Sequence, residues 1–402
     1  MEAAKIVATL TRTVGDIGLA EDLAQEALVD ALTQWPSGGV PRNPGAWLTT
    51  VAKRKAIDHW RRQDNLDAKY AAMAREMEDH VHDAWDPDRI DDDVLRLIFM
   101  STHPTLSREN QIALTLRVVG GLTTEEIARA FLVPKSTVAQ RIVRAKKTLA
   151  GVPFEVPDRS DFPTRLSAVL SVIYLVFNEG YSASSGRQWI RDELCFEALR
   201  LGRILAALTS DEAEVLGLVA LMEFQSSRLR ARTDRDGTPI LLHDQNRAAW
   251  DRAQIQRGVD ALQRTSDVLH RKGIGWGYYS LQAALAECHA VAATYADTDW
   301  ARIVSLYDAL LRLAPSPVVE LNRAIAVAMA DPVGGPTAAL ATVDAITGLD
   351  GTHLVPSVRG ELLVRMRRVE EAAAEFDVAA ELTDNDRERE VLRDKARRAR
   401  QE

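Results

Sequence analysis

Apolar residues recur at intervals of three and four along most of the chain, the spacing that gives an α-helix one buried face. In the first part of the chain this pattern predicts amphipathic helices over residues 3–14, 19–35 and 45–62. Shorter helices are expected over 94–99 and 111–119. We therefore expect an all-α fold.

Residues 120–149 form two short amphipathic helices joined by a turn that ends at Pro134. Thr124 is expected to cap the first helix, where Glu125 and Glu126 suit the positive end of the helix dipole. The predicted inward residues are Ile127, Ala128, Phe131, Val138, Ile142 and Leu149, with Leu132 and Val133 in the turn. The segment is predicted to be a helix-turn-helix.

The second helix of this pair has a basic outer face. Ser136 or Thr137 is expected to cap it. Its outward residues are Lys135, Thr137, Gln140, Arg141, Arg144, Lys146 and Lys147, with no acidic residue between Glu126 and Glu155. A basic face is often only solvated surface. Here, however, the small Ala128 at the helix crossing, the Pro134 turn and the one-sided charge together favour insertion into the major groove of DNA.

Charge is distributed unevenly along the 402 residues, whose formal net charge is -8. Residues 53–62 and 135–147 are basic, whereas residues 63–93 hold eleven Asp and Glu against three Lys and Arg. Contact with nucleic acid should therefore be local. The composition of 64–93 is typical of an extended linker, although a simple solvated tether explains it equally well.

The sequence lacks paired cysteines, membrane segments and catalytic motifs, and these absences indicate where the protein is located and what chemistry it carries out. Cys195 and Cys288 stand far apart, so no disulfide framework or Cys-x-x-Cys metal site is indicated, and a cytoplasmic location fits best. We find neither a signal-like segment nor an apolar run of membrane-spanning length. No nucleophile or nucleotide-binding motif occurs, so we expect no enzyme activity, no cofactor and no metal.

The predicted helix 45–62 combines aromatic and cationic residues. Trp47 and Trp60 lie on its apolar side, and its cations are Lys53, Arg54, Lys55, Arg61 and Arg62. Bases stack on aromatic rings while cations follow phosphates, so this combination suits single-stranded nucleic acid. Both tryptophans can instead belong to the core, which is the favoured interpretation for Trp47. Residues 36–44 before this helix are predicted to be a loop.

Three segments in this order resemble an extracytoplasmic-function (ECF) sigma factor of bacterial RNA polymerase, a member of the sigma-70 family. They are the run AEDLAQEA at 20–27, the run WLTTVAKRKAIDHWRR at 47–62, and the helix-turn-helix after an acidic linker. The resemblance covers residues 1–150. It implies a first module over 1–63 that binds polymerase and the -10 element, and a second over 94–150 that reads the -35 element.

The same resemblance implies roles for individual residues and names core RNA polymerase and promoter DNA as partners. Asp22, Leu23, Gln25 and Glu26 match the polymerase-binding motif. Lys53, Arg54, Arg61 and Arg62 fall on the helix that faces the -10 element, near the 36–44 loop. Lys135, Thr137, Gln140, Arg141, Arg144 and Lys147 fall on the helix that reads the -35 element.

Four features depart from the pattern of the family. The chain begins partway into what is normally a longer first module. Arg54 stands where Asn is frequent, Leu132 replaces a usual turn glycine, and Ala139 occupies a position that often carries a base-contacting polar side chain. These departures affect the expected promoter sequence, and they shift specificity toward Gln140 and Arg144.

Residues 160–298 are predicted to form a helical extension, and residues 299–400 contain a repeat. The segments 306–315, 339–346 and 374–382 recur at about the 34-residue period of tetratricopeptide (TPR) helix pairs. A long helical extension resembles a subgroup of ECF factors in which it controls activity. The alternative is a helix-turn-helix regulator that acts without polymerase, with the extension as a ligand or protein sensor.

One polar set in the extension is a candidate regulatory site, which would bind a regulatory protein or a small ligand. It comprises Asn178, Glu179, His243, Asp244, Gln245 and Arg247. The set forms one site only if the fold brings 178–179 to 243–247. A buried hydrogen-bond network that joins helices explains the same residues and is the favoured interpretation.

Overall fold

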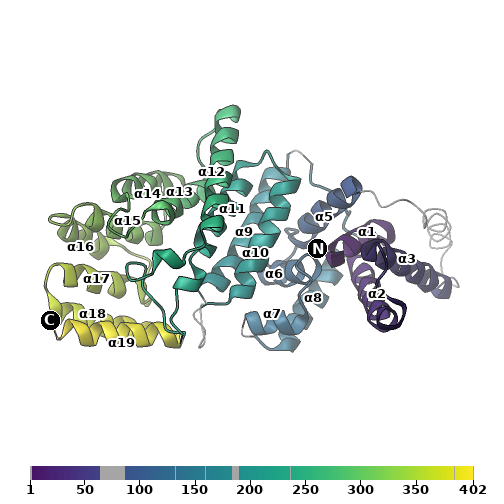
Figure 1. Ribbon diagram of the computed structural model, residues 1–402, viewed down its shortest axis with the longest axis horizontal. Helices are drawn as coiled ribbons and strands as arrows, with labels where there is room; N and C mark the ends of the chain where they lie inside the picture. The colour runs from purple at the N-terminus through teal and green to yellow at the C-terminus, as the bar shows by residue number, and fades with distance from the viewer. Residues whose placement is uncertain are drawn as a thin grey trace. The chain divides into compact units, whose positions relative to one another are not determined.

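The computed structural model describes residues 2–63, 87–131, 133–158, 160–182, 190–235, 237–383 and 385–401. Over these residues the fold is all-α, as predicted, and no strand is present beyond isolated bridge positions, such as the pair Thr233 and Pro239. The chain divides into two compact units, residues 1–173 and 174–402 (Figure 1).

The first unit contains a group of helices around α1 and a helix-turn-helix. Its helices are α1 (Glu2–Val14), α2 (Ile17–Gly38), α3 (Pro44–Gln63), α5 (Pro87–Ser101), α6 (Arg108–Val118), α7 (Thr124–Ala130), α8 (Lys135–Leu149) and the first part of α9 (Phe162–Tyr181). Helix α1 packs against α2, α3 and α5, while α6 packs against α7 and α8. Ile6, Val7 and Leu10 are buried on α1, as their helical spacing predicts.

Two boundaries in this unit differ from the prediction. Helix α5 begins at Pro87, so residues 87–93 are helical although their acidic composition suggests a linker. Asp93 is buried and pairs with Arg12 at 2.9 Å and Arg96 at 2.7 Å, and these partners compensate its charge. Helix α2 continues through Pro36 to Gly38, so the expected loop at 36–44 is reduced to residues 39–43. The rest of the expected linker, 64–86, lies outside the described residues.

The second unit is a succession of helices. They are the end of α9, then α10 (Asp192–Leu208), α11 (Ala213–Ser226), η1 (Leu229–Ala231), η2 (Arg247–Ala249), α12 (Arg252–Lys272), α13 (Tyr278–Val291), α14 (Trp300–Leu313), α15 (Pro317–Ala330), α16 (Gly335–Ala345), α17 (Leu354–Arg365), α18 (Val369–Leu382) and α19 (Asp386–Ala399). From α10 onward each α-helix packs against the next α-helix. Most residues of α11 are buried, because α10, α12 and α13 all pack against it.

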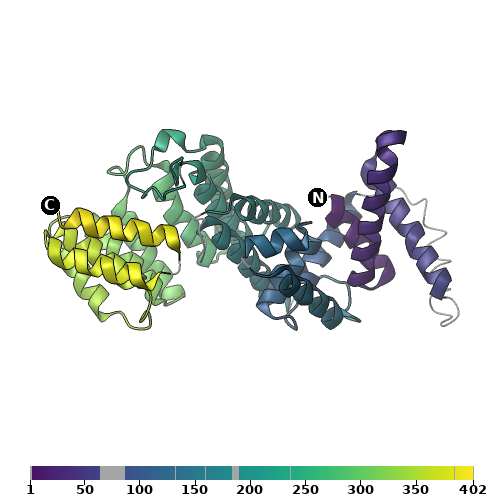
Figure 2. The ribbon, with the colours of Figure 1, turned by 90° about the horizontal axis from the view of Figure 1, so that it is seen from below.

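The predicted repeat falls on alternate helices. Its three segments lie on α14, α16 and α18, and each packs against the helix that follows it. Two of these pairs share an ion pair at the same spacing. Arg323 bonds Asp308 at 2.6 Å and Arg359 bonds Asp344 at 3.0 Å, and in both cases 15 residues separate the partners. The helices α18 and α19 lie side by side in both ribbon views (Figure 1 and Figure 2).

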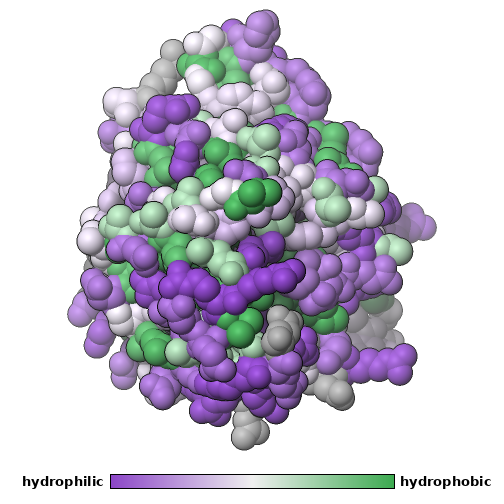
Figure 3. Space-filling model, turned by 90° about the vertical axis from the view of Figure 1, so that its left-hand side faces the viewer, coloured by the Kyte–Doolittle hydropathy of each residue, from purple (hydrophilic) through white to green (hydrophobic). Residues whose placement is uncertain are grey.

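Close packing within the repeat requires a glycine at one position. A Cβ on Gly360 of α17 would lie 2.6 Å from the ring of Phe376 on α18, which is itself buried. The outer surface at the C-terminal end is mostly hydrophilic, with hydrophobic residues in small separate patches (Figure 3). The apolar side chains of this part of the chain are therefore largely used between its helices.

Candidate nucleic-acid interface

The helix-turn-helix is built from α7 and α8. Thr123 and Glu126 form a capping box at the start of α7: the Glu126 amide donates to Thr123 Oγ1 at 3.1 Å, and the Thr123 amide donates to the Glu126 carboxylate at 2.7 Å. The capping residue is thus Thr123, not the predicted Thr124. The inward residues Ile127, Ala128, Val138, Ile142 and Leu149 are buried as expected, whereas Phe131 is half-buried. Leu132 lies outside the described residues.

Helix α8 presents the predicted basic face. Lys135, Gln140, Arg144 and Lys147 are exposed, while Thr137 and Arg141 are half-buried. The prediction that Ser136 or Thr137 caps this helix is wrong, because Pro134 occupies the N-cap and no side chain bonds there. Two apolar residues, Ala139 and Val143, are also exposed on this face, and Val143 is 64% exposed.

On helix α3, one predicted nucleic-acid contact is exposed. Arg54 is exposed and Lys53 is half-buried, whereas Lys55 bonds Asp30 on α2 at 3.0 Å. The hydrogen bond to Asp30, with a smaller contribution from Glu26, raises the pKa of Lys55. Arg61 and Arg62 lie in the last turn of α3, but their side chains are outside the described part of the chain.

The two tryptophans of α3 have different environments. Trp60 is fully buried, as a core residue should be. Trp47 is only half-buried and meets Trp35 of α2 edge-on, with 5.4 Å between ring centroids. The expectation that Trp47 belongs to the core is therefore wrong, and this aromatic pair lies partly open beside the 39–43 loop.

Helix α2 carries the residues expected to bind polymerase. Asp22, Gln25 and Glu26 are exposed, but Leu23 is buried and is a core residue. The helical pattern also predicts an inward Leu32, which is wrong: Leu32 is 77% exposed and Val29 is 60% exposed. The outer face of α2 thus combines carboxylates with two exposed apolar side chains, a composition that suits a protein partner.

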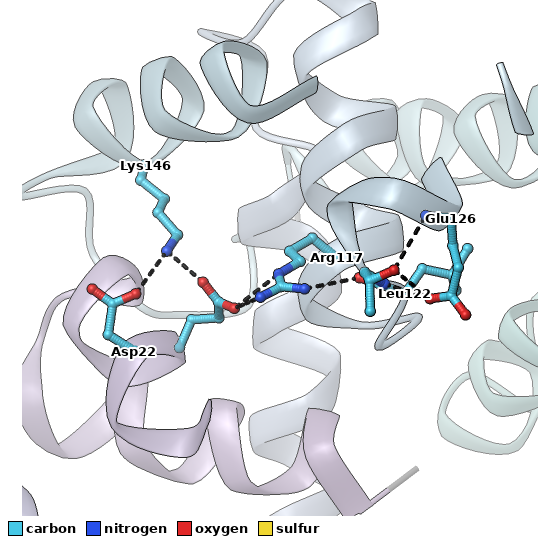
Figure 4. Close-up of polar contacts among 7 residues, drawn as sticks. Asp22, Arg117, Leu122, Glu126 and Lys146 are labelled. Atoms are coloured by element: carbon cyan, nitrogen blue, oxygen red, sulfur yellow. Dashed lines mark hydrogen bonds and ion pairs between the residues drawn. The ribbon is translucent and has the colours of Figure 1, made fainter. Parts of the chain in front are cut away.

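A buried carboxylate joins α2 to the helix-turn-helix (Figure 4). Glu21 is 4% exposed, and its carboxylate accepts hydrogen bonds from Arg117 Nε on α6 at 2.8 Å and Lys146 Nζ on α8 at 2.5 Å. Lys146 also lies 3.4 Å from the Asp22 carboxylate, and Arg117 donates to the carbonyl of Leu122 at 3.2 Å (Figure 4). Lys146 therefore belongs to this contact and not to the outward basic face.

The comparisons with known proteins agree with this arrangement. Residues 2–66 match the family Sigma-70 region 2, and residues 96–149 match Sigma-70, region 4. Residues 165–266 match a family of unknown function, DUF6596. The chain also aligns with a probable ECF RNA polymerase sigma factor, SigI, of Mycobacterium tuberculosis (strain CDC 1551 / Oshkosh), at 31% identity over 150 residues. The chain belongs to the ECF sigma factors.

Two relatives describe how far this similarity extends. An uncharacterized protein, R00370, of Rhizobium meliloti (strain 1021) is 43% identical over 391 residues, which are 96% of the sigma factor and 90% of the relative. The SigI alignment covers 34% of the sigma factor and 48% of SigI. No solved structure matches the chain. As a sigma-70 factor, the protein is a transcription initiation factor whose partners are core RNA polymerase and promoter DNA.

The sequence pattern of this sigma factor did not predict the contact of Glu21 with Arg117 and Lys146. Glu21 and Arg117 lie 96 residues apart, and Glu21 and Lys146 lie 125 apart. Glu21 precedes the residues expected to bind polymerase and resembles any other acidic residue on a helix. No local pattern distinguishes it, because its burial depends on partners from another module.

Among the residues that the structure describes, no hydrogen bond or ion pair joins Asn178 and Glu179 to residues 243–247. Glu179 pairs with Arg191, whereas the Asn178 side chain bonds the Tyr174 hydroxyl. His243 and Asp244 lie 3.3 Å apart and are largely exposed. The remaining two, Gln245 and Arg247, are buried and bond backbone carbonyls: Gln245 Nε2 donates to Ile240 at 2.9 Å, and Arg247 Nη1 donates to Ala292 at 2.8 Å.

Both cysteines of the sigma factor are buried thiols. Burial raises the pKa of Cys195 to about 12 and that of Cys288 to about 11, so both stay protonated at neutral pH. Within the described ranges, no group of three or more His, Cys, Asp and Glu residues is arranged to hold a metal ion. Among the same residues, no helix has the length and apolarity needed to cross a bilayer.

Proposed function

We propose that this sigma factor directs promoter-specific initiation through two DNA-facing helices and that its C-terminal extension controls this activity. Helix α8 would read the -35 element with Lys135, Thr137, Gln140, Arg141, Arg144 and Lys147. Helix α3 would face the -10 element with Lys53, Arg54, Arg61 and Arg62. Asp22, Gln25 and Glu26 on α2 would bind core polymerase, with Leu32 and Val29 completing that surface.

Charge and exposure support the promoter contacts. The exposed face of α8 carries Lys135, Arg144 and Lys147 and no carboxylate. The ion pair of Lys135 with Glu125, at 2.5 Å, joins two exposed groups and is weak enough for phosphate to replace the carboxylate. Exposed cations on the second helix of a helix-turn-helix are what major-groove binding requires.

Control by the extension rests on α9. This helix begins in the first unit, where the ring of Phe162 lies 5.3 Å from that of Phe99 on α5, and Arg165 Nη2 donates to the Phe99 carbonyl at 2.8 Å. It ends in the second unit, where the Tyr174 hydroxyl donates to Gln282 at 2.9 Å. Helix α9 therefore contains residues of both units, and we propose that the extension acts on the promoter-reading module through this helix.

Run-off transcription with purified core polymerase tests this control. We compare the full chain with a chain that ends at Asp158 and with a full-length variant carrying Phe162→Ala and Arg165→Ala. The truncation should change promoter output, and the double variant serves as the control for loss of the α9 contacts on Phe99. Unchanged output from the truncated chain contradicts control by the extension.

An assay of binding to core RNA polymerase distinguishes a sigma factor from a regulator that acts without polymerase. Alanine at Asp22, Gln25 and Glu26 should abolish binding to core polymerase while leaving binding of the isolated -35 DNA duplex unchanged, because these exposed residues lie on α2 and not on α8. Retained core binding in the triple variant contradicts the assigned surface.

A further inference from the structure

A buried arginine in the extension lacks a carboxylate partner. Arg247, the first residue of η2, is 8% exposed. Its Nη1 donates to the carbonyls of His289 at 2.5 Å and Ala292 at 2.8 Å, and its guanidinium lies 4.7 Å from the ring centre of Trp250. Within the described ranges, its Nη2 has no acceptor. Carbonyl groups orient this guanidinium but leave its full positive charge uncompensated.

Two further arginines increase this charge. Arg228 and Arg252 both lie close enough to Arg247 to lower its pKa by repulsion, after the larger effect of burial. Arg228 donates to Gln225 at 3.1 Å, and Arg252 donates to the Arg247 carbonyl at 3.5 Å. Over the described part of the chain, none of the three forms an ion pair with a carboxylate. Three cations therefore gather without an anion.

The acidic group that acts on Arg247 has hydrogen-bond partners in its own loop. Asp297 attracts Arg247 only weakly, and its carboxylate accepts hydrogen bonds from the Thr294 amide at 3.0 Å and the Thr294 hydroxyl at 2.7 Å. These bonds hold Asp297 in the loop after α13. Asp297 is thus hydrogen-bonded within its own loop, and within the described ranges no carboxylate bonds any of the three arginines.

Other buried polar atoms without partners border Arg247. In the described part of the chain, Trp250 Nε1 and His289 Nδ1 are buried without a hydrogen-bond partner. Trp250 stacks on the guanidinium, and His289 contributes the carbonyl that Arg247 bonds. Burial lowers the pKa of His289 to about 4, so its ring is neutral at pH 7 and one of its nitrogens carries a proton to donate.

Backbone contacts hold these groups together. The Asp251 amide donates to the Ser227 carbonyl at 2.8 Å, which keeps the start of α12 beside the end of α11. Asn246 caps η2 by accepting from the Ala248 amide at 3.0 Å. The arginines are therefore placed by the fold and not by mutual attraction, which would be impossible for like charges.

We propose that Arg228, Arg247 and Arg252, with Trp250 and His289, form a binding site for the oxyanion group of a small ligand, either a phosphate or a carboxylate. Guanidinium groups bind such oxygens through paired N–H donors at well-defined geometry. All three arginines lie in the stretch that matches the family DUF6596. The proposal concerns ligand binding by the full chain and does not depend on transcription.

Thermal unfolding and calorimetry of the full-length protein test this site, with inorganic phosphate and acetate as probes at constant ionic strength in chloride. We expect phosphate, acetate or both to raise the midpoint of unfolding by several degrees and to give a saturable binding isotherm. The probe that binds more tightly identifies the ligand group. No stabilisation by either probe beyond that of chloride overturns the proposal.

Arginine variants locate the binding. Arg228→Gln, at a half-buried position, should weaken binding about tenfold, and Arg247→Gln should abolish it. Arg230→Gln, at an exposed position on η1, is the matched control and should bind as the unmodified protein does. If Arg247→Gln fails to fold, Arg228→Gln and Arg252→Gln decide. Binding that is equally strong in these two variants overturns the proposed site.

Discussion

Glu21 and Lys146 form a hydrogen-bonded ion pair, with 2.5 Å between the carboxylate and Nζ, that joins region 2 to the recognition helix of region 4. Arg117 binds the same carboxylate from α6. The pair fastens α2, which carries the residues proposed to bind polymerase, to α8, which carries the residues proposed to read the promoter. Because Glu21 and Lys146 are largely shielded from water, removing one partner leaves the other as an uncompensated charge away from water.

Replacing Glu21 with Gln should separate the two regions more easily. The substitution keeps the shape of the side chain but leaves Arg117 and Lys146 without their anion, and breaking a buried pair in this way costs roughly 3–5 kcal/mol at most. Urea unfolding measures the loss. Asp22→Asn is the matched control, since Asp22 is 72% exposed and 3.4 Å from Lys146. Equal destabilisation by both changes would contradict a special role of Glu21.

Two leucines on α2 should give opposite phenotypes. Leu23→Ala removes a buried side chain and should destabilise the protein by about 2–5 kcal/mol. Leu32→Asp changes a residue that is 77% exposed, so stability should persist while binding to core polymerase falls. Thermal unfolding and a pull-down with core polymerase distinguish them. Normal core binding by a folded Leu32→Asp protein removes Leu32 from the proposed surface.

Arg144 and Lys147 should contribute differently to promoter binding. Arg144→Ala should cost about 1–3 kcal/mol and relax specificity at one base pair of the -35 element, because a guanidinium recognises guanine by two hydrogen bonds. Lys147→Ala should weaken binding to all duplexes. It should also reduce the slope of the logarithm of the binding constant against the logarithm of the salt concentration by about one. Binding titrations on a set of single-base variants test this. A uniform loss from both changes contradicts the assignment.

The exposed Val143 suggests contact with a thymine methyl group. Val143 and Ala139 form an apolar strip one helical turn apart on the face of α8. Replacing one contacted thymine of the -35 element with deoxyuridine removes only the methyl group and should weaken binding by about 0.8 kcal/mol, the transfer value of one buried carbon group. The variant Val143→Ala should no longer respond to this replacement. If the replacement weakens binding of Val143→Ala as much as it weakens binding of the unmodified protein, Val143 does not contact the thymine methyl group.

Stability should fall in mild acid because of His289. Burial, assisted by Arg228 and Arg247, lowers its pKa from 6.5 to about 4 in the folded chain. The unfolded chain therefore binds a proton at His289 near pH 6.5, and the folded chain only near pH 4. Its stabilising contribution is complete above pH 6.5 and declines by about 1–3 kcal/mol as the pH falls to 4. Urea unfolding at several pH values measures this decline, which His289→Gln should reduce.

Much of the fold follows from local pattern. The helix-turn-helix was predictable because Ile127, Val138 and Ile142 obey helical spacing within one short segment. The repeat over α14–α19 was predictable because similar segments recur. The ends of helices were predicted less accurately. Thr123 caps α7 by accepting from the Glu126 amide, whereas the neighbouring Thr124, which has the same intrinsic preference for the N-cap, was predicted. A local pattern cannot choose between adjacent residues of the same type.

The sequence by itself determined the family, the helical periodicity and the basic outer face of α8, since these depend on residues close together in the chain. Only the tertiary structure decided which polar groups are buried and what they contact. Glu21 meets Arg117 and Lys146 across 96 and 125 residues, Leu32 faces outward although it fits the apolar pattern, and Arg247 is buried against the end of α13. Burial of a charge depends on which distant helices pack around it, and that packing is a property of the whole fold.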